Sequence, residues 1–351
     1  MLEFMRRFVR SEAVMKDRQQ AERFVSNLYR GVLGREPDQP GFEAHVRALL
    51  TGTSYGDLLE EFVTSEEFRL RTSGVKLFVP PGDFYSPIGN PAQIDGYLSA
   101  LEAAGTPSTV PGIALDRAEM VATWRALLPF LGSIPFTAEK SSGLRYAFVN
   151  PHYSWGDGSI LHAMLRHLRP KRLIEIGSGW SSACTLDTVE RYLDGNCELT
   201  FIDPHPELLH SLIDGMTTPV QIIGKPVQSL PLSIFDELQS GDVLFIDSTH
   251  ILSTGSDVCF ELFEILPRLV PGVVVHFHDM FWPFEYSREW AVDENRSWNE
   301  LYAVRAFLTQ SAGWRFLMFN DYMAKFERTL IEATYPDFFK NSGGALWIQR
   351  L

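Results

Sequence analysis

Acidic and histidine side chains follow several apolar segments of the sequence, at the points where those segments end. Asp203 closes the segment ELTFID, Asp247 closes DVLFID, and the pair His278 and Asp279 closes GVVVHFHD. Runs of this kind are typical of buried strands, and strands that alternate with helices form a parallel sheet. Because ligands of such sheets bind at the carboxyl ends of the strands, we expect these side chains to converge on one site.

A glycine-rich turn follows another apolar segment, RLIEIG, and runs through Gly177, Ser178 and Gly179. Glycines let the backbone turn sharply and approach a ligand closely. Ser182 stands where a pyrophosphate-binding fingerprint has its third glycine, which weakens that interpretation and leaves a plain strand–helix turn as the alternative. Asp203, at the end of another strand, suits both hydroxyls of a ribose. The alternative for Asp203 is a solvated turn acid, but Glu175 in the same motif favours nucleoside binding.

Composition narrows the possible functions. The chain has 351 residues, and 31 Lys and Arg against 44 Asp and Glu give a net charge of −13. This balance argues against a duplex nucleic-acid binder and against an anionic membrane surface as a partner. Three cysteines argue against a disulfide framework, and no apolar run approaches the roughly 18 residues of a membrane span. The N-terminus lacks the pattern of a signal peptide, so we expect a cytoplasmic location.

The pattern of apolar residues divides the chain into three parts. Residues 1–75 carry short amphipathic helical patterns and predict a small all-α module. Residues 76–150 are rich in Pro and Gly and predict a connector or lid. Residues 151–351 alternate strands with helices and end in two strand-like segments, WRFLMF and ALWIQR. This part predicts an α/β fold, a Rossmann-like doubly wound seven-stranded sheet with an antiparallel last strand.

The order of these motifs resembles the class I S-adenosylmethionine-dependent methyltransferases, and more narrowly the metal-dependent catechol O-methyltransferase type. The resemblance spans about residues 150–351, begins at Tyr153-Ser154-Trp155-Gly156-Asp157, and is nearest to an uncharacterised bacterial family with an HFHD strand end. The segment LYRGVLGREPD in the helical module resembles a bacterial helical domain of unknown function that recurs in proteins linked to surface structures and glycans.

The resemblance implies S-adenosyl-L-methionine as the cofactor. Glu175 and the glycine turn would hold its methionyl part, Asp203 its ribose, and Val227 and Gln228 its adenine. Asp157, which the sequence also allows as a helix cap, would contact the cofactor carboxylate or amine together with Ser154. The expected cofactor-binding residues are Ser154, Asp157, Glu175, Gly177, Ser178, Gly179, Asp203, Val227 and Gln228.

The resemblance also implies a divalent metal, held by Asp247, His278 and Asp279. In the family these positions are often Asp, Asp and Asn, so His278 stands where an acid is usual. Two carboxylates with an imidazole admit Mg²⁺ or Mn²⁺, and also Fe²⁺ or Zn²⁺. The alternative is that Asp247 and Asp279 only orient a histidine.

His250 lies three residues after Asp247, where the catechol-type enzymes place a lysine base. A histidine is a competent base for a hydroxyl near neutral pH, so His250 with Asp247 forms the predicted catalytic pair. The alternative for His250 is a histidine of a polar surface loop. His276, inside its strand, is interpreted as a core residue.

The segment after Asp279 concentrates aromatic and polar residues. Such a mixture suits the pocket of a carbohydrate or aromatic acceptor. The alternative is that these rings fill core beneath a long loop, and that alternative is preferred for Trp298. The predicted substrate-binding residues are Trp282, Glu285, Tyr286, Trp290 and Asn299.

Together these features predict an S-adenosylmethionine-dependent, metal-assisted O-methyltransferase that acts on a hydroxyl of a sugar, a glycan or another small molecule. One alternative is a nucleotide-binding oxidoreductase on the same fold, which Ser182 and the lack of a Tyr-x-x-x-Lys motif disfavour. Another is a non-catalytic binding or assembly protein. In that alternative the helical module would carry the function. The helical module is also where we expect a homo-oligomer contact or a protein partner.

Overall fold

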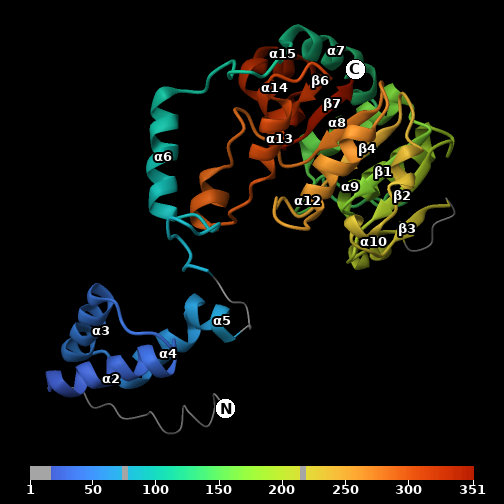
Figure 1. Ribbon diagram of the computed structural model, residues 1–351. Coiled ribbons are helices and arrows are strands. Elements are labelled where there is room, and N and C mark those ends of the chain that lie inside the picture. Colours follow the sequence, from blue (N-terminus) through green and yellow to red (C-terminus); the bar gives the residue numbers. More distant parts are fainter. Residues whose placement is uncertain (1–16, 73–77, 214–218) are drawn as a thin grey trace. The chain divides into compact units, whose positions relative to one another are not determined.

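The structure is a computed structural model that describes residues 17–72, 78–213 and 219–351. The chain divides into two compact units, one ending at Asn90 and the other beginning at Pro91 (Figure 1). Each unit buries an apolar core of its own. Within the described ranges, no helix is both long enough and apolar enough to cross a bilayer.

Short amphipathic helices form the first unit. They are α2 (Arg18–Gly31), α3 (Gln39–Thr51), α4 (Tyr55–Thr64) and α5 (Glu66–Thr72). Asp17 begins α2, because its side chain accepts a hydrogen bond from the amide of Gln19. The apolar residues of these helices face one another in a small core made of Ala21, Val25, Leu28, Tyr29, Leu33, Val46, Leu49, Leu58 and Phe62. This is the all-α module that the sequence predicts.

A sheet forms the centre of the second unit. In the described residues it has seven strands, namely β1 (Arg172–Ile176), β2 (Glu198–Ile202), β3 (Gln221–Ile223), β4 (Val243–Ile246), β5 (Val274–Phe277), β6 (Trp314–Phe319) and β7 (Leu346–Arg350). Their order is β3-β2-β1-β4-β5-β7-β6. The first five strands are parallel, and β7 runs antiparallel to both of its neighbours. The predicted Rossmann-like α/β sheet with an antiparallel last strand is confirmed.

Helices cover this sheet, which explains why every side chain of β4 and β5 is buried. The helices are α7 (Arg117–Leu131), α8 (Trp155–Leu168), α9 (Trp180–Tyr192), α10 (Glu207–Leu212), α11 (Ser233–Asp236), α12 (Asp257–Phe260), α13 (Glu300–Leu308), α14 (Asn320–Phe326) and α15 (Arg328–Thr334). Helix α8 packs between α7 and α9 and is buried along most of its length. It therefore holds the residues of its first turn in fixed positions against the sheet.

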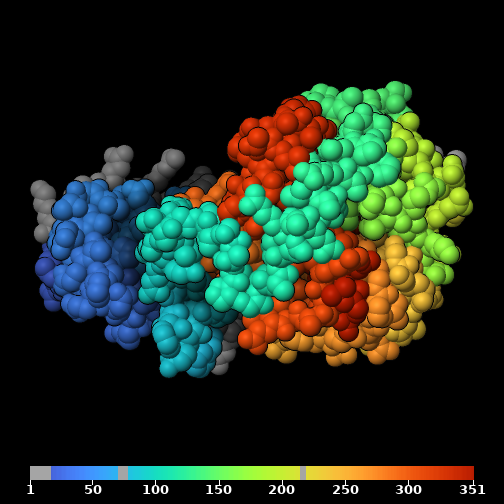
Figure 2. Space-filling model, turned by 90° about the horizontal axis from the view of Figure 1, so that it is seen from above, coloured from blue at the N-terminus to red at the C-terminus, as the bar shows by residue number. Residues whose placement is uncertain are grey.

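The segment before this sheet belongs to the same unit from Pro91 onward, and its residues enter the core of that unit from Val110. Helix α6 (Pro91–Ala104) opens the second unit, and α7 then packs against α8 and β6. The indole of Trp124 is fully buried and donates to the hydroxyl of Thr334 over 3.0 Å. Figure 2 shows the teal residues of this segment lying against the red C-terminal segment. Residues 91–150 thus supply structure to the sheet domain.

Two helical patterns near the carboxyl edge of the sheet are less regular than the sequence predicts. Residues 258–266 predict one helix, but α12 gives way to a π-helical turn, η2 (Glu261–Ile265), and a short 3₁₀ turn, η3 (Leu266–Arg268). Pro267 lacks an amide hydrogen, which is consistent with the early end of the α-helix. Residues 298–308 likewise predict one helix, but α13 begins only at Glu300, so Trp298 precedes it. Irregular helical turns of this kind often lie at functional sites.

Candidate active site

A pocket of about 760 Å³ lies at the carboxyl ends of the parallel strands. Gly177, Asp203, Asp247 and Asp279 line it, and each follows a different strand of the sheet. The structure therefore brings together the strand-end residues that the sequence predicts to converge. Ligand pockets generally have volumes of roughly 300–1,000 Å³, so this one has room for a cofactor and a small acceptor.

The glycine turn forms one wall of the pocket. Gly177 has a φ of +81°, and a Cβ atom at this position would collide with the carbonyl oxygen of Asp247. Gly177 therefore has to be a glycine, both for its conformation and for the closeness of β4. Gly179 ends the turn and begins α9, and Ser178 between them also lines the pocket.

Asp203 is fixed against this turn. Its carboxylate accepts hydrogen bonds from the amide and the hydroxyl of Ser178, over 2.9 and 2.8 Å, and from the amide of His205 over 2.7 Å. Val227 and Gln228, in the short 3₁₀ turn η1 (Val227–Ser229) after β3, line the same pocket. The expected ribose and adenine residues therefore lie together with the glycine turn.

Glu175 does not line the pocket. It is fully buried, and its carboxyl group accepts hydrogen bonds from the hydroxyls of Ser181 and Ser182, over 2.5 and 2.9 Å. Burial raises the pKa of Glu175 to about 8, so the group is protonated near neutral pH. The hydroxyl of Ser182 also accepts from the amide of Gly179 over 3.0 Å. Ser182 stands where the pyrophosphate-binding fingerprint has its third glycine, and its hydroxyl binds the end of the glycine turn.

Ser154 and Asp157 also lie outside the pocket lining. Ser154 donates its hydroxyl to the carbonyl of Phe148 over 2.8 Å. Asp157 lies in the first turn of α8, buried, and its carboxylate accepts from the side-chain amide of Asn320 and the amide of Gly344. The structure places Asp157 behind His278, whereas Ser154 is the N-cap residue of α8.

Both ring nitrogens of His278 face carboxylates. Nε2 lies 3.3 Å from Oδ2 of Asp157, and Nδ1 lies 3.3 Å from Oδ1 of Asp247. Burial alone would lower the pKa of His278, but Asp279, Asp247 and Asp157 outweigh it and raise the pKa well above its usual value. The carboxylates around this ring therefore favour its protonated form, in which both nitrogens can donate.

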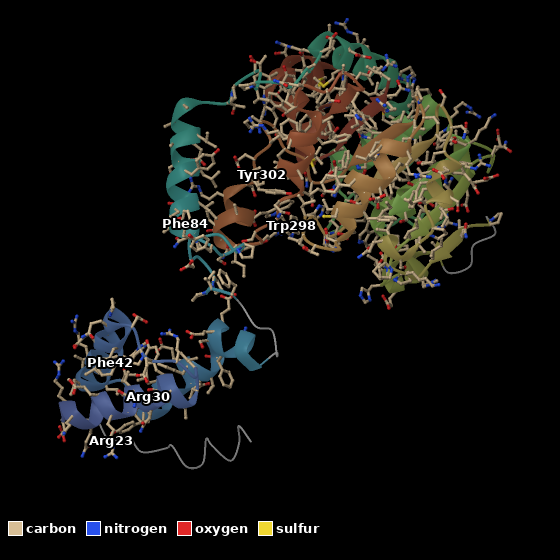
Figure 3. All side chains as sticks on the ribbon, viewed as in Figure 1. Arg23, Arg30, Phe42, Phe84, Trp298 and Tyr302 are labelled. Carbon is tan, nitrogen blue, oxygen red and sulfur yellow. The ribbon has the colours of Figure 1, made fainter. Side chains whose placement is uncertain are left out.

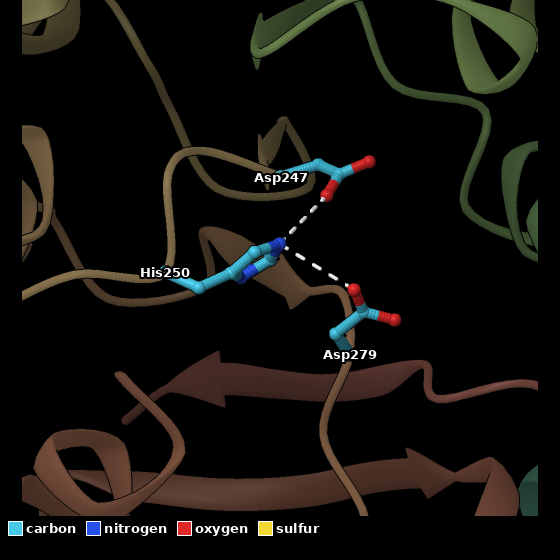
Figure 4. Close-up of side chains that lie close together, drawn as sticks. All are labelled: Asp247, His250 and Asp279. Atoms are coloured by element: carbon cyan, nitrogen blue, oxygen red, sulfur yellow. Dashed lines mark ion pairs between the residues drawn. The ribbon is translucent and has the colours of Figure 1, made fainter. Parts of the chain in front are cut away.

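His250 points its Nε2 between two carboxylates (Figure 4). Nε2 lies 3.6 Å from Oδ1 of Asp247 and 3.4 Å from Oδ2 of Asp279. One ligand atom from each of the three residues lies within 4.8 Å of the others, so this set has the spacing of a metal site. The structure therefore groups Asp247 and Asp279 with His250 as well as with His278, which the sequence analysis named as the ligand.

Glu300 is a site residue that the sequence analysis missed. Its carboxylate lies 2.7 Å from Nδ1 of His250, and the amides of Asn299 and Glu300 both donate to the carbonyl of His250 over 3.1 Å. His250 has a φ of +62°. Left-handed backbone of this kind persists only where the surroundings enforce it, and here the start of α13 does so. The signal in the sequence was only an acid at the beginning of a helical pattern.

The carboxylates set the charge state of this cluster. Burial alone would lower the pKa of His250, but Glu300, Asp247 and Asp279 outweigh it and raise the pKa. Desolvation raises the pKa of Asp247, yet the imidazoles of His278 and His250 overcome that effect and lower it to about 2. The result is an anionic Asp247 beside two histidines that hold protons readily.

The aromatic segment after β5 divides between core and pocket. Trp290, in the π-helical turn η4 (Glu289–Asp293), lines the pocket, and so does Trp298. Figure 3 labels Trp298, whose ring centre lies 4.3 Å from that of His250. Trp298 is partly buried and packs against the core while it also lines the pocket, so the preference for it as a core residue holds only in part. Trp180 and Arg296 are among the other lining residues that were not predicted from the sequence.

The other predicted substrate residues do not line the pocket and have structural partners. Trp282 is buried and donates its indole N–H to the carbonyl of Pro107 over 2.6 Å. The hydroxyl of Tyr286 accepts from the amide of Leu301. The remaining two pair with polar groups, Glu285 with the hydroxyls of Tyr97 and Tyr302, and Asn299 with the backbone of Leu252. Tyr286 also packs against the rings of Trp290 and Trp298.

Two segments of this chain match known protein families, and one of the two contains the site. Residues 174–280 match the family described as a methyltransferase domain, a segment that contains the glycine turn, Asp203, Asp247, His250 and Asp279. Residues 5–72 match a domain of unknown function (DUF4214). An uncharacterized protein of Archaeoglobus fulgidus is 30% identical over 168 residues, which are 47% of this chain and 75% of that protein.

Solved structures with some likeness include two methyltransferases. The S-adenosylhomocysteine-bound enzyme PaMTH1 of Podospora anserina is 15% identical, with a TM-score of 0.37 over 79% of this chain and 100% of that chain. Human N-acetylserotonin methyltransferase in complex with S-adenosylmethionine is 14% identical, with a TM-score of 0.32 over 95% of this chain and 94% of that chain. Likenesses this distant add no weight to the assignment.

The strand order and the matched segment define a class I S-adenosylmethionine-dependent methyltransferase. The chain belongs to this family, and the protein is an S-adenosylmethionine-dependent methyltransferase that carries an additional N-terminal helical domain. The oxidoreductase and the non-catalytic alternatives are thereby set aside.

Proposed function

We propose that this methyltransferase transfers its methyl group to a hydroxyl of a small molecule, with His250 as the base. The supporting observation is that one pocket is lined by the glycine turn with Asp203 and also by His250, which Glu300 orients. A cofactor on the glycine turn and an acceptor beside His250 would therefore share a single pocket.

For the cofactor, we propose that Asp203 accepts hydrogen bonds from the ribose hydroxyls. The backbone of Gly177, Ser178 and Gly179 would pass along the methionyl part, and Val227 and Gln228 would contact the adenine. Glu175 acts from behind the turn, because it holds Ser181 and Ser182. Direct contact of the cofactor with Glu175, Ser154 or Asp157 stays a prediction.

Transfer of the methyl group requires a base for the acceptor hydroxyl and alignment of the two reactants. The acceptor oxygen forms a bond to the methyl carbon while the bond from carbon to the sulfonium sulfur breaks, and the electron pair stays on sulfur as a neutral thioether. The hydroxyl proton passes to Nε2 of His250. Glu300, Asp247 and Asp279 favour the resulting imidazolium, because all three are acids next to the ring. Alignment of the two reactants supplies the rest of the acceleration.

A divalent metal is a second candidate feature, favoured by the spacing of Asp247, His250 and Asp279. Glu300 on Nδ1 of His250 matches the carboxylate that commonly backs a metal-bound histidine. His278, the ligand expected from the sequence, is not part of the group of residues that has this spacing. A bound ion would lower the pKa of the acceptor hydroxyl. The same nitrogen of His250 cannot bind an ion and accept a proton at once, so the two roles exclude each other.

The acceptor we propose is a hydroxyl of a sugar, a glycan or a comparable small molecule. Support comes from the aromatic faces of Trp290 and Trp298 beside His250, which suit flat or ring-shaped acceptors. The cytoplasmic location and an oligomer or partner bound through the helical domain stay predictions.

Release of S-adenosylhomocysteine in the presence of a panel of hydroxyl, amine and thiol acceptors tests this proposal. We expect turnover with a hydroxyl acceptor, and a loss of about 10²-fold or more in kcat for His250→Gln. If activity survives exhaustive chelation, His250 is the base. If chelation abolishes activity and a divalent ion restores it, the metal role holds. Methylation of amines only, or an unaffected His250→Gln variant, would contradict the proposed chemistry.

A further inference from the structure

We infer that the acceptor end of this pocket binds an oxyanion through Arg296, so that the methyl acceptor carries a carboxylate or a phosphate near its reacting hydroxyl. The inference rests on the proposed function and adds the class of substrate to it. Four observations carry it, namely the position of Arg296, the loop that fixes it, its closeness to His250 and the charges of the other lining residues.

Arg296 lies over two tryptophan rings in the wall of the pocket. Its Cζ atom is 4.1 Å from the ring centre of Trp290 and 4.5 Å from that of Trp298. Glu294 accepts a hydrogen bond from Nε of Arg296, while among the described residues no group accepts from the two terminal nitrogens. The guanidinium is therefore held in place by stacking and by one ion pair, with its terminal donors left for a ligand.

The loop around Arg296 is built to hold this position. The amide of Arg296 donates to the carbonyl of Trp290 over 3.0 Å. Asn295 and Ser297, on either side of Arg296, have φ values of +47° and +52°. Left-handed conformations at such residues are unfavourable and cluster at functional sites. The loop then leads into α13, whose first residue, Glu300, is bound to His250.

Arg296 and the proposed base share Trp298. The ring centre of Trp298 lies 4.3 Å from the ring centre of His250 and 4.5 Å from Cζ of Arg296. These two contacts limit the separation of base and guanidinium to the reach of a single sugar or aromatic ring. One small acceptor can therefore present its hydroxyl to His250 and an oxyanion to Arg296.

The charges of the pocket favour this orientation. Arg296 is the only arginine or lysine among the lining residues that the structure describes, whereas the acids Asp203, Asp247, Asp257 and Asp279 line the same pocket. An oxyanion would be repelled at every acidic position and attracted at Arg296. A guanidinium binds carboxylates and phosphates through paired hydrogen bonds, which gives both affinity and direction.

Calorimetry with matched acceptor pairs tests the inference. Each pair differs by one oxyanion: catechol and 3,4-dihydroxybenzoate, galactose and galacturonate, glucose and glucose 6-phosphate. The protein is first saturated with S-adenosylhomocysteine. We expect at least one oxyanion compound to bind about tenfold or more tightly than its neutral partner. Arg296→Gln should remove this preference, and Arg296→Lys should restore it only in part. The carboxylate and phosphate pairs show which oxyanion is preferred.

Several outcomes separate this inference from the proposed function. Equal binding of both members in every pair, or a preference that survives Arg296→Gln, overturns the oxyanion subsite. A marked loss of S-adenosylhomocysteine affinity in Arg296→Gln would assign the arginine to the cofactor and also overturn it. Arg315→Gln, a change at an exposed arginine of β6, is the matched control and should alter nothing. If the wild type fails to bind S-adenosylhomocysteine at all, the proposed function fails first.

Discussion

Glu300 holds His250 through both its side chain and its backbone. The carboxylate lies 2.7 Å from Nδ1 of the ring, and the amide donates to the carbonyl of His250 over 3.1 Å. This double attachment sets the tautomer of the ring and leaves Nε2 directed between Asp247 and Asp279. The start of α13 therefore fixes the orientation and the tautomer of His250, which lies in the loop after β4.

Removal of the Glu300 charge should lower the pKa of His250. The acids that face this ring are Glu300 from α13, Asp247 from the end of β4 and Asp279 from the end of β5, and together they raise its pKa. In the metal-free protein, NMR titration of wild type and Glu300→Gln should show the His250 pKa lower in the variant. Methyl transfer needs the neutral ring, so the rise of activity with pH should shift to lower pH.

The same variant should lose kcat by about tenfold or more, because a glutamine does not fix the tautomer as a carboxylate does. Glu332→Gln, at an exposed ion pair of α15, is the control and should leave both the pKa and kcat unchanged. A His250 pKa that does not move in Glu300→Gln would contradict the coupling.

Glu175 should make the protein less stable as pH rises. Its folded pKa of about 8 lies above the ordinary value near 4.5, so the folded state binds a proton that the unfolded state releases. The stabilising contribution is complete below about pH 4.5 and is lost as pH rises toward 8, at about 1.4 kcal/mol per pH unit. Glu175→Gln, which cannot titrate, should lack this part of the pH dependence.

Urea unfolding of wild type and Glu175→Gln at pH 5.5 and pH 7.5 measures this effect. The histidines His250 and His278 contribute a dependence of the same sign to both proteins, so the difference between the two isolates Glu175. Identical pH dependence in wild type and variant would show that Glu175 is not protonated in the folded state.

Trp282 and Trp290 should respond oppositely to substitution, although they lie in one aromatic segment. Trp282 is 1% exposed and hydrogen-bonded to Pro107, so Trp282→Ala should cost about 3–5 kcal/mol in the free energy of unfolding. Trp290 lines the pocket, so Trp290→Ala should cost far less and should weaken acceptor binding. Thermal unfolding and acceptor titration of both variants test this contrast. Equal loss of stability would show that Trp290 is core as well.

The sheet could be predicted from the sequence because its strands are short apolar runs that end in recognisable residues. The positions that directly follow a strand were placed correctly in the pocket, for example Gly177, Asp203 and Asp247. For these residues the parallel topology itself determines the location, so no knowledge of side-chain packing was needed.

Residues outside the strand ends could not be placed in the same way. The segment after Asp279 has no regular period, so nothing in the sequence separates the buried Trp282 from the pocket-lining Trp298. Glu300 looks like any acid in the first turn of a helix, and its contact with His250 depends on a loop with left-handed residues. Glu175 is turned away from the pocket because Ser181 and Ser182 bind it.

Calorimetric titration with S-adenosylhomocysteine tests the central claim most directly, since it needs neither an acceptor nor a metal. We expect one site per chain in the wild type, a large loss of affinity in Asp203→Ala, and unchanged affinity in Asp236→Ala, a change at an exposed acid paired with Arg268. Circular dichroism should show that each variant is folded. No binding by the folded wild type, or equal binding by folded Asp203→Ala, would contradict a cofactor site at this edge of the sheet.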